Sequence, residues 1–306
     1  MTTPVILCCG EAVLDLVPAP LADGSNGLSP VPGGAAVNTS VALARQNVPS
    51  GFLGALSRDT AGDLMAGYMR QEGVDLTLTP RLTEPSTISF ARPIPGGTHF
   101  DLHDFGSAGQ ALRRSHLPEL SDTTRTLVLG GISLIPDLSG AAFETLAAQA
   151  GPRLVWLDLN IRPGLVTDPD SYRARLNRMM SWADVIKVSD EDLDWLGCSS
   201  ETLRDHHPNA MLLHSRGADG AEIWSGEMHA ALPCRTVPVV DTVGAGDILN
   251  AGMLAWLYHA GLLHRPLTPD HRQLTEALAA GIEAATFSVS RPGSCSPNRE
   301  EVSCAP

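Results

Sequence analysis

Asp241–Asp247 reads DTVGAGD, and a run of apolar residues follows it directly. The preceding segment, 235–240, is rich in Val and Thr, which predicts a strand. A strand, a turn of small residues and a buried helix together aim backbone N–H groups at an anion. Gly244 and Gly246 let the backbone approach a phosphate without an intervening side chain. Asp247 falls in the first helical turn, where an acid also caps a helix well, but the whole composition favours a catalytic site.

Composition and charge narrow the class of protein. The chain has 306 residues, 43% of them apolar, which is enough for one large core. Its formal net charge of −13 argues against nucleic acid or an anionic membrane as a partner. Lys187 is the only lysine and lies outside any GxxxxGK(S/T) sequence, and no GxGxxG follows a strand. These absences exclude a Walker-type nucleotide site and argue against a dinucleotide fold, but a local anion hole remains compatible with ATP.

The sequence also predicts where the protein resides. Its six cysteines form no CxxC pair, and Cys8 and Cys9 are adjacent in an apparent core strand, so we expect reduced thiols. The N-terminus passes from MTTP into a strand without a basic region or a cleavage site. No apolar run reaches membrane-spanning length. The expected location is the cytoplasm.

Apolar strands alternate with helices along most of the chain. The hydrophobic pattern predicts strands at 5–16, 51–56, 126–134, 154–160, 184–188 and 211–215. It predicts helices between them at 35–47, 61–72, 139–150, 171–182 and 191–196. This alternation indicates an α/β fold with a mainly parallel sheet covered on both faces. Ligands bind such sheets beyond the carboxyl ends of the strands, where the motifs described here fall.

Two stretches interrupt the alternation. Residues 19–34 are rich in Pro and Gly, and residues 86–107 alternate β-formers with polar residues around a Pro95-Gly96-Gly97 turn. We expect them to form a small sheet, interpreted as a lid. The predicted organisation is a single domain, 1–306, with lid strands inserted at about 12–34 and 86–107.

Two further features fit either a sugar site or a structural role. Gly33-Gly34 precedes a predicted helix, and Asn38, one turn into it, offers the donor and acceptor that suit sugar hydroxyls. Asp15 stands at the expected end of the first strand, where its carboxylate could accept two hydroxyl protons. Taken alone, each feature is also explained by turn chemistry or a satisfied core group.

Three motifs together resemble one family. GEAVLDL (10–16), GGAAVNTSVALARQN (33–47) and DTVGAGD (241–247) match, in order and spacing, the ribokinase-like (PfkB-type) sugar kinases over essentially the whole chain. The resemblance implies a ribokinase-like three-layer α/β fold with a small β-sheet lid. It also implies transfer of the γ-phosphoryl group of ATP to a sugar or nucleoside hydroxyl.

The same resemblance implies roles for individual residues. Asp247 would take the proton of the attacking hydroxyl, and the remaining positions divide between the phosphoryl group, the sugar and the nucleotide. The N–H groups of Gly244, Ala245 and Gly246 would form the anion hole. Asp15, Gly33, Gly34 and Asn38 would hold the sugar. Ser215, Gly217 and Gly220 in the turn 214–220 would lie along the phosphates and ribose, with Lys187, Ser189 and Gly246 also on the nucleotide side, although the turn alone also fits a β-hairpin.

The chain departs from the family at its metal-tuning and adenine positions. Ser189-Asp190-Glu191-Asp192 stands where many members carry Asn-x-x-Glu, so Asp192 would reach Mg²⁺ through water. Ile282 stands where many members have Asn, which puts the usual polar contact to adenine in doubt. By the same resemblance, Asp241, near the loop 291–293, would bind K⁺.

The segment 158–163, DLNIRP, discriminates among sugars. It resembles the fructokinase and 2-keto-3-deoxygluconate kinase branches, and the segments 100–112 and 187–193 resemble fructokinases. Asn160 would contact the sugar. The planar fork of Arg162 suits the transferring phosphate or a substrate carboxylate, whereas its structural alternative is an ion pair with Asp158. D-Fructose, phosphorylated at its 6-hydroxyl, is the favoured acceptor, with 2-keto-3-deoxygluconate as the alternative.

Cofactors, partners and other functions complete the expectations. Phosphoryl transfer from ATP implies Mg²⁺. Exposed edges of the lid strands need covering, which favours a homodimer through the lid. A non-catalytic sugar or nucleotide sensor and a nucleoside kinase of the same fold are the competing hypotheses.

Overall fold

The computed structural model describes residues 3–94 and 97–302. Pro95 and Gly96 of the expected turn, and Cys304, therefore lie outside the described residues. Its largest element is an eight-stranded sheet with the order β14-β13-β12-β11-β10-β9-β1-β4. The strands are β1 (Ile6–Cys9), β4 (Ser50–Leu53), β9 (Thr126–Gly130), β10 (Leu154–Asp158), β11 (Val185–Ser189), β12 (Met211–Ser215), β13 (Ala221–Ser225) and β14 (Met228–Leu232).

This sheet is mainly parallel, as predicted. Six neighbouring strands pair in parallel, in the order β4-β1-β9-β10-β11-β12. The strands β13 and β14 add an antiparallel edge beyond β12. The carboxyl ends of β1, β9, β10 and β11 therefore meet at one edge of the sheet, where ligands bind in such folds.

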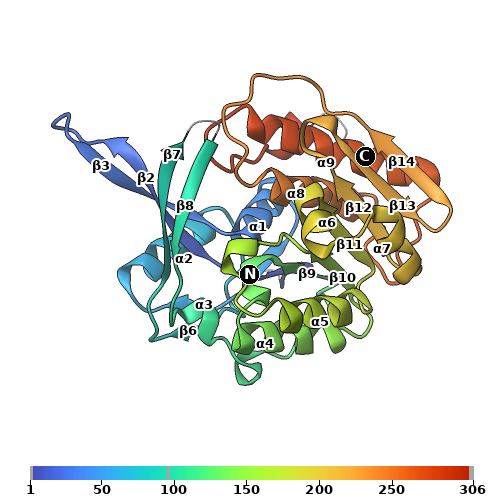
Figure 1. Cartoon of the computed structure of the whole chain (residues 1–306), viewed down its shortest axis with the longest axis horizontal. Helices are drawn as coiled ribbons and strands as arrows, with labels where there is room; N and C mark the ends of the chain where they lie inside the picture. The colour runs from blue at the N-terminus through green and yellow to red at the C-terminus, as the bar shows by residue number, and fades with distance from the viewer. Residues whose placement is uncertain (1–2, 95–96, 303–306) are drawn as a thin grey trace.

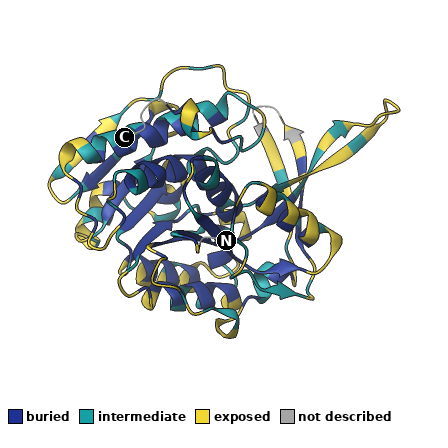
Figure 2. Ribbon diagram, turned by 180° about the vertical axis from the view of Figure 1, so that it is seen from behind, coloured by how far each residue is buried: buried dark blue, intermediate teal, exposed yellow. Residues whose placement is uncertain are grey.

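Helices cover both faces of the sheet (Figure 1). Alternate residues of β1 point to opposite faces, so Cys8 belongs to one hydrophobic cluster and Cys9 to the other. One face packs against α1 (Ala35–Arg45), α2 (Thr60–Gln71), α8 (Ala245–His259) and α9 (His271–Val289). The other packs against α3 (Ala108–Ala111), α4 (Asp137–Ala148), α5 (Pro169–Met180), α6 (Asp190–Leu196) and α7 (Ser200–His206). Figure 2 shows the strands as a buried layer between the helices.

A separate four-stranded sheet, here called the small sheet, projects from one side of this body (Figure 1). Its order is β3-β2-β7-β8, from β2 (Val13–Pro20), β3 (Asn26–Gly33), β7 (Thr87–Ile94) and β8 (Gly97–His103). A further pair, β5 (Leu56–Ser57) and β6 (Arg81–Leu82), lies near its base. The α/β class with a large, mainly parallel sheet and a small separate sheet is thus confirmed.

The expected single strand over 5–16 is wrong. The chain leaves the large sheet after Cys9, turns at Gly10–Ala12 and enters β2 of the small sheet. Pro18 and Pro20 lack the N–H that a strand paired on both sides needs. They lie in the part of β2 that pairs with β3 alone, beyond its pairing with β7. Asp15 therefore lies on the small sheet and does not end a core strand.

Other boundaries differ for local reasons. Segment 235–240 forms no strand, because Pro238 interrupts the donor pattern and Val239 and Val240 are 64% and 58% exposed. The strand predicted at 126–134 ends at Gly130 and continues as a 3₁₀ turn, Gly131–Leu134. The remaining predicted elements agree within three residues at each end. Among the described helices, none combines the length and apolar character required to span a bilayer.

Candidate active site

The DTVGAGD turn places Asp247 at the start of α8. Gly244 is the N-cap, with φ of +74°, a conformation that favours glycine. A Cβ on Gly244 would also lie 2.7 Å from the Cβ of Ser294. The turn is therefore built for glycine by both its backbone conformation and its packing.

The free N–H groups of this turn differ from those expected. The Ala245 N–H donates to the Thr242 carbonyl at 3.3 Å. Within residues 3–94 and 97–302, the N–H groups of Gly244, Gly246 and Asp247 have no backbone acceptor. Unsatisfied N–H groups and the helix dipole favour an anion at this end of α8. The N–H groups of Gly244, Gly246 and Asp247 are therefore available to a phosphoryl group, and the anion hole expected from Gly244, Ala245 and Gly246 stays a prediction.

The Asp247 carboxylate is buried but not isolated. Asp247 is 7% exposed, and Asn38 Nδ2 donates to its Oδ2 at 2.8 Å. Burial raises the pKa of Asp247 to about 7; the charge of Asp158 adds to this, while Asn38 and Lys187 oppose it. A carboxylate with a pKa near neutrality is suited to accept a proton from a hydroxyl group.

Asn38 holds the Asp247 carboxylate through a direct hydrogen bond and is itself held by Ser294. Its Oδ1 accepts a hydrogen bond from Ser294 Oγ at 2.9 Å, so the carboxamide bridges the starts of α1 and α8 and the loop after α9. These two bonds use one of its two amide hydrogens and one oxygen lone pair. The remaining hydrogen-bonding capacity is compatible with the expected sugar contact, which stays a prediction.

A buried polar network lies beneath the turn, and the sequence reading missed most of it. Lys187 Nζ lies 3.1 Å from Asp158 Oδ1, and Asn250 Nδ2 donates to Asp158 Oδ2 at 2.7 Å. Trp156 Nε1 donates in turn to Asn250 Oδ1 at 2.9 Å. A Cβ on Gly246 would lie 3.1 Å from Lys187 Nζ. The only lysine of the chain is therefore held directly behind the turn 241–247.

Charge keeps this lysine protonated. Burial lowers the pKa of Lys187, but the nearby carboxylates of Asp158 and Asp192 raise it by more. Lys187 is 4% exposed and Asp158 5%, so the pair interacts with little screening. The ammonium adds positive potential near the start of α8, where a phosphoryl group would carry negative charge.

Glu11 also lies at the carboxyl edge of the large sheet, and the sequence analysis assigned it no role. Its Oε1 accepts the Ala35 N–H at 3.1 Å, and its Oε2 accepts the Ser133 N–H at 3.3 Å. The carboxylate thus caps α1 and ties it to the turn after β9. Burial raises the pKa of Glu11, although these backbone donors and Arg162 act against that rise.

Asp15 and the double glycine lie together, and their contact with a sugar stays a prediction. A Cβ on Gly33 would be 2.7 Å from Asp15 Oδ2, and one on Gly34, whose φ is +103°, would be 2.6 Å from the Glu11 carbonyl oxygen. Burial raises the pKa of Asp15 to about 6, and the Ser89 hydroxyl partly counters it. The small sheet therefore brings a second carboxylate toward the start of α1.

Asn160 and Arg162 follow β10 in an irregular turn. Asn160 has φ of +41°, and Arg162 donates from one guanidinium nitrogen to the Asn160 and Ile161 carbonyls at 3.3 and 3.1 Å. Asp158 pairs with Lys187, so the structural ion pair considered for Arg162 is not formed. Over the described ranges, Arg162 has no acidic partner within 4.0 Å, which leaves its guanidinium available to an anion.

The expected nucleotide turn is also a hairpin connection. β12 and β13 pair antiparallel on either side of it, and Ser215 Oγ donates to the Val188 carbonyl at 3.3 Å. Gly217 and Gly220 have φ of +52° and +97°. A Cβ on Gly220 would lie 2.1 Å from the Leu232 carbonyl oxygen. Close packing of the strands explains Gly220, and the nucleotide roles of these residues stay predictions.

Asp192 occupies a capping position at the start of α6. Its Oδ1 accepts the Ile161 N–H at 2.7 Å, and its Oδ2 accepts the Ser189 N–H at 2.8 Å and the Ser189 hydroxyl at 2.9 Å. Asp192 is 1% exposed. Both oxygens are therefore committed to the fold, and its contact with Mg²⁺ through water stays a prediction. Within the described ranges, no three His, Cys, Asp or Glu side chains cluster in an arrangement suited to a metal ion.

Asp241 joins the two loops expected around K⁺. Its Oδ1 accepts the Val243 N–H and its Oδ2 the Gly293 N–H, each at 3.0 Å. The loops at 241–243 and 291–293 are therefore adjacent. This contact is structural, and K⁺ binding here stays a prediction.

Comparison with known proteins agrees with this geometry. The model of the pfkB family carbohydrate kinases matches residues 4–301. A fructokinase of Rhizobium leguminosarum bv. trifolii is 38% identical over 268 residues, which cover 85% of this chain and 81% of that protein. A fructokinase structure from Xylella fastidiosa with bound ATP has a TM-score of 0.86 at 25% identity, covering 97% of this chain and 96% of that one. One from Vibrio cholerae O395, bound to fructose, ADP and calcium, has a TM-score of 0.82 at 23% identity, covering 95% and 94%.

Proposed function

The chain belongs to the pfkB family of carbohydrate kinases, and we propose that it phosphorylates D-fructose at the 6-hydroxyl. The family expected from the three motifs is thereby confirmed, and with it an ATP-dependent sugar kinase. One observation carries the catalytic assignment. Asp247 is buried, held by Asn38 and placed beside the free N–H groups that begin α8.

In the proposed reaction, Asp247 accepts the proton of the attacking sugar hydroxyl. The hydroxyl oxygen bonds to the γ-phosphorus, and the bond from that phosphorus to the β–γ bridging oxygen breaks, which releases ADP. The N–H groups of Gly246 and Asp247 stabilise the phosphoryl oxygens, with Lys187 adding charge from behind. Phosphoryl transfer depends mainly on such positioning and charge stabilisation. Arg162 is proposed to reach the same phosphoryl group.

Metal ions would assist phosphoryl transfer, although the structure offers no free carboxylate at Asp192 to bind Mg²⁺ directly. Mg²⁺ would enter with ATP, bound mainly by phosphate oxygens and water, because both Asp192 oxygens are occupied. Its chemistry is to neutralise the charge of the phosphates. K⁺ is proposed at the paired loops near Asp241 as an activating ion.

The sugar would lie between the large sheet and the small sheet. Asp15, Gly33 and Gly34 face it from the base of the small sheet, with Asn38 and Asn160 on the main body. We propose that the small sheet acts as a lid over this space. Fructose needs hydroxyl acceptors, which Asp15 supplies. 2-Keto-3-deoxygluconate remains the second candidate, because Arg162 could pair with its carboxylate.

The small sheet also offers a surface for self-association. Leu28, Val31, Phe90 and Ile94 are between 39% and 46% exposed. Such residues on a sheet with open edges β3 and β8 favour pairing with another copy. We therefore propose that two copies form a homodimer through the small sheet. Size-exclusion chromatography with light scattering tests this oligomeric state. We also propose that the enzyme is cytoplasmic.

A coupled ADP-release assay tests the proposed acceptor. Mg-ATP is supplied with fructose, 2-keto-3-deoxygluconate, ribose, inosine or no acceptor. Turnover that is fastest with fructose supports the proposal, and fast turnover only with the sugar acid moves Arg162 into substrate recognition. Tight fructose binding without ADP release would favour the sensor hypothesis.

A further inference from the structure

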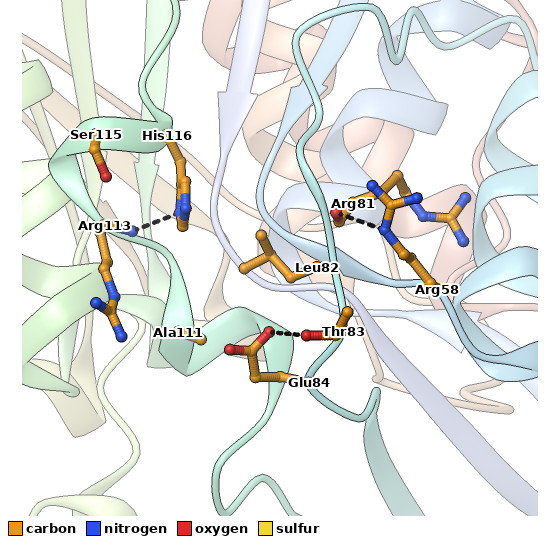
Figure 3. A pocket seen from close by; sticks show the side chains of 9 residues that line it. All are labelled: Arg58, Arg81, Leu82, Thr83, Glu84, Ala111, Arg113, Ser115 and His116. Atoms are coloured by element: carbon orange, nitrogen blue, oxygen red, sulfur yellow. Dashed lines mark hydrogen bonds between the residues drawn. The ribbon is translucent and has the colours of Figure 1, made fainter.

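A pocket of about 360 Å³ lies apart from the candidate active site, at the base of the small sheet (Figure 3). It lies within the lower part of the size range of small-molecule sites. Arg58 and Arg81 line one side, Arg113 and His116 the other, and Thr83 and Glu84 lie between them. None of the proposed sugar, nucleotide or catalytic residues lines this pocket.

Positive charge gathers here against the overall charge of the protein. Three arginines face one glutamate in a chain whose formal net charge is −13. A local excess of cations in a concave site concentrates anions even when the whole molecule repels them. The lining therefore selects for an anionic ligand.

Two of the three guanidinium groups are available to such a ligand. Arg81 is committed, because it donates to the Ser57 carbonyl and pairs with Asp63. Arg58 uses Nε on the Arg81 carbonyl at 3.2 Å. In the part of the chain that the structure describes, neither Arg58 nor Arg113 has an acidic partner within 4.0 Å. A guanidinium fork with free N–H groups suits phosphate or carboxylate.

His116 adds an imidazole ring to this set. Its Nδ1 accepts the Arg113 N–H at 3.2 Å, which places the proton of the neutral ring on Nε2. Glu84 works in the opposite direction, since its carboxylate repels an anion. Among the described residues, its side chain accepts a hydrogen bond from the Thr83 hydroxyl at 3.5 Å and pairs with no cation.

The pocket joins two segments that tether the small sheet, the one entering β7 and the one leaving β8. Thr83 and Glu84 come shortly before β7 (Thr87–Ile94), and Arg113 and His116 come after β8 (Gly97–His103) and α3. A ligand held by both sides would bridge the segment entering β7 and the segment leaving β8.

We propose that this pocket binds a small metabolite with two or more negative charges, a phosphate ester or a polycarboxylate, through Arg58 and Arg113. Binding there is separate from the kinase reaction and does not rest on the identity of the sugar. Occupancy would hold the two tether segments together and reduce their local opening.

Calorimetry with the full chain tests the site. Glycerol 3-phosphate represents the phosphate esters and citrate the polycarboxylates, each titrated with saturating ADP present to fill the nucleotide site. Arg58→Gln and Arg113→Gln should each weaken binding by about tenfold, as expected for loss of a charge-assisted contact. Glu84→Gln should strengthen it, because a like charge is removed. Arg272→Gln, an exposed arginine on α9, is the matched control and should bind as the unmodified protein does.

Hydrogen exchange localises the ligand independently of activity. The tighter of the two probes should slow amide exchange at 83–86 and 113–116, and not at 241–247. The ligand class is then given by which probe binds. Absence of binding by both probes, binding unaffected by Arg58→Gln and Arg113→Gln, or loss of binding when ADP is added would each overturn the proposal.

Discussion

Asn38 Nδ2 lies 2.8 Å from Asp247 Oδ2, although the two residues are 209 positions apart in the chain. The bond joins the first turns of α1 and α8, so the glycine-rich starts of both helices meet at one carboxylate. This contact combines the proposed sugar and phosphoryl subsites in one place. It also opposes the effect of burial on the Asp247 pKa.

The pH dependence of the reaction should report Asp247. Only the ionised carboxylate can accept the hydroxyl proton, and burial raises its pKa to about 7. We expect kcat/KM for the sugar to rise with pH through about 7 and then level off. Asn38→Leu removes the hydrogen bond that lowers the pKa, so the midpoint should move to higher pH. A profile that is flat across neutrality in both proteins would exclude Asp247 as the titrating base.

Asp247 should reduce stability while it supports catalysis. Its folded-state pKa of about 7 exceeds the ordinary value of 3.8, so between these values the native protein retains a proton that the unfolded chain has released. The free energy of unfolding therefore falls as pH rises through this window. We expect Asp247→Asn to be more stable than the unmodified protein above pH 7, measured by urea unfolding. The advantage should shrink as the pH is lowered below 7, and an advantage independent of pH would contradict the assigned shift.

The buried pair of Lys187 and Asp158 should be sensitive to removal of one partner. Lys187→Met leaves the Asp158 carboxylate buried without its cation, which costs about 3–5 kcal/mol of unfolding free energy. The double variant Lys187→Met with Asp158→Asn removes both charges and should recover most of that loss. Chemical denaturation compares the two, and equal destabilisation in both would show that packing, rather than charge, dominates.

Gly244 should tolerate no side chain. Alanine there must adopt φ of +74° with its Cβ 2.7 Å from Ser294 Cβ, which costs on the order of 1–3 kcal/mol. Because the turn would shift, kcat should fall together with stability. Gly164→Ala is the matched control, since nothing lies within 4 Å of its added Cβ and its φ is not positive. Normal turnover in Gly244→Ala would show that the turn geometry is not needed for catalysis.

The sequence predicted the parts of the site that local chemistry encodes. The turn 241–247 and the helix beginning at Ala35 need small residues in fixed order, and such patterns are visible without a structure. The small sheet was expected because Pro and Gly interrupt the helix–strand alternation at the right places. The placement of Asp15 was not, because an apolar run that passes from one sheet to another reads as one strand.

Contacts between distant segments were the main omission. Asn250 reaches Asp158 across 92 positions and Ser133 reaches Glu11 across 122, so no local pattern pairs them. One signal was available, since a lysine within the apolar strand 185–189 needs a buried carboxylate partner. The strand before the DTVGAGD turn was wrong because Val and Thr content outweighed Pro238 in that prediction.

Turnover by Asp247→Asn with Mg-ATP and fructose tests the central claim most directly. The substitution keeps an oxygen acceptor for Asn38 but removes the base, so kcat should fall by about 10³ relative to the unmodified protein while circular dichroism is unchanged. Asp122→Asn, at an exposed turn, is the matched control and should retain full activity. A folded Asp247→Asn protein that keeps more than about a tenth of the activity would contradict the assignment of Asp247 as the base.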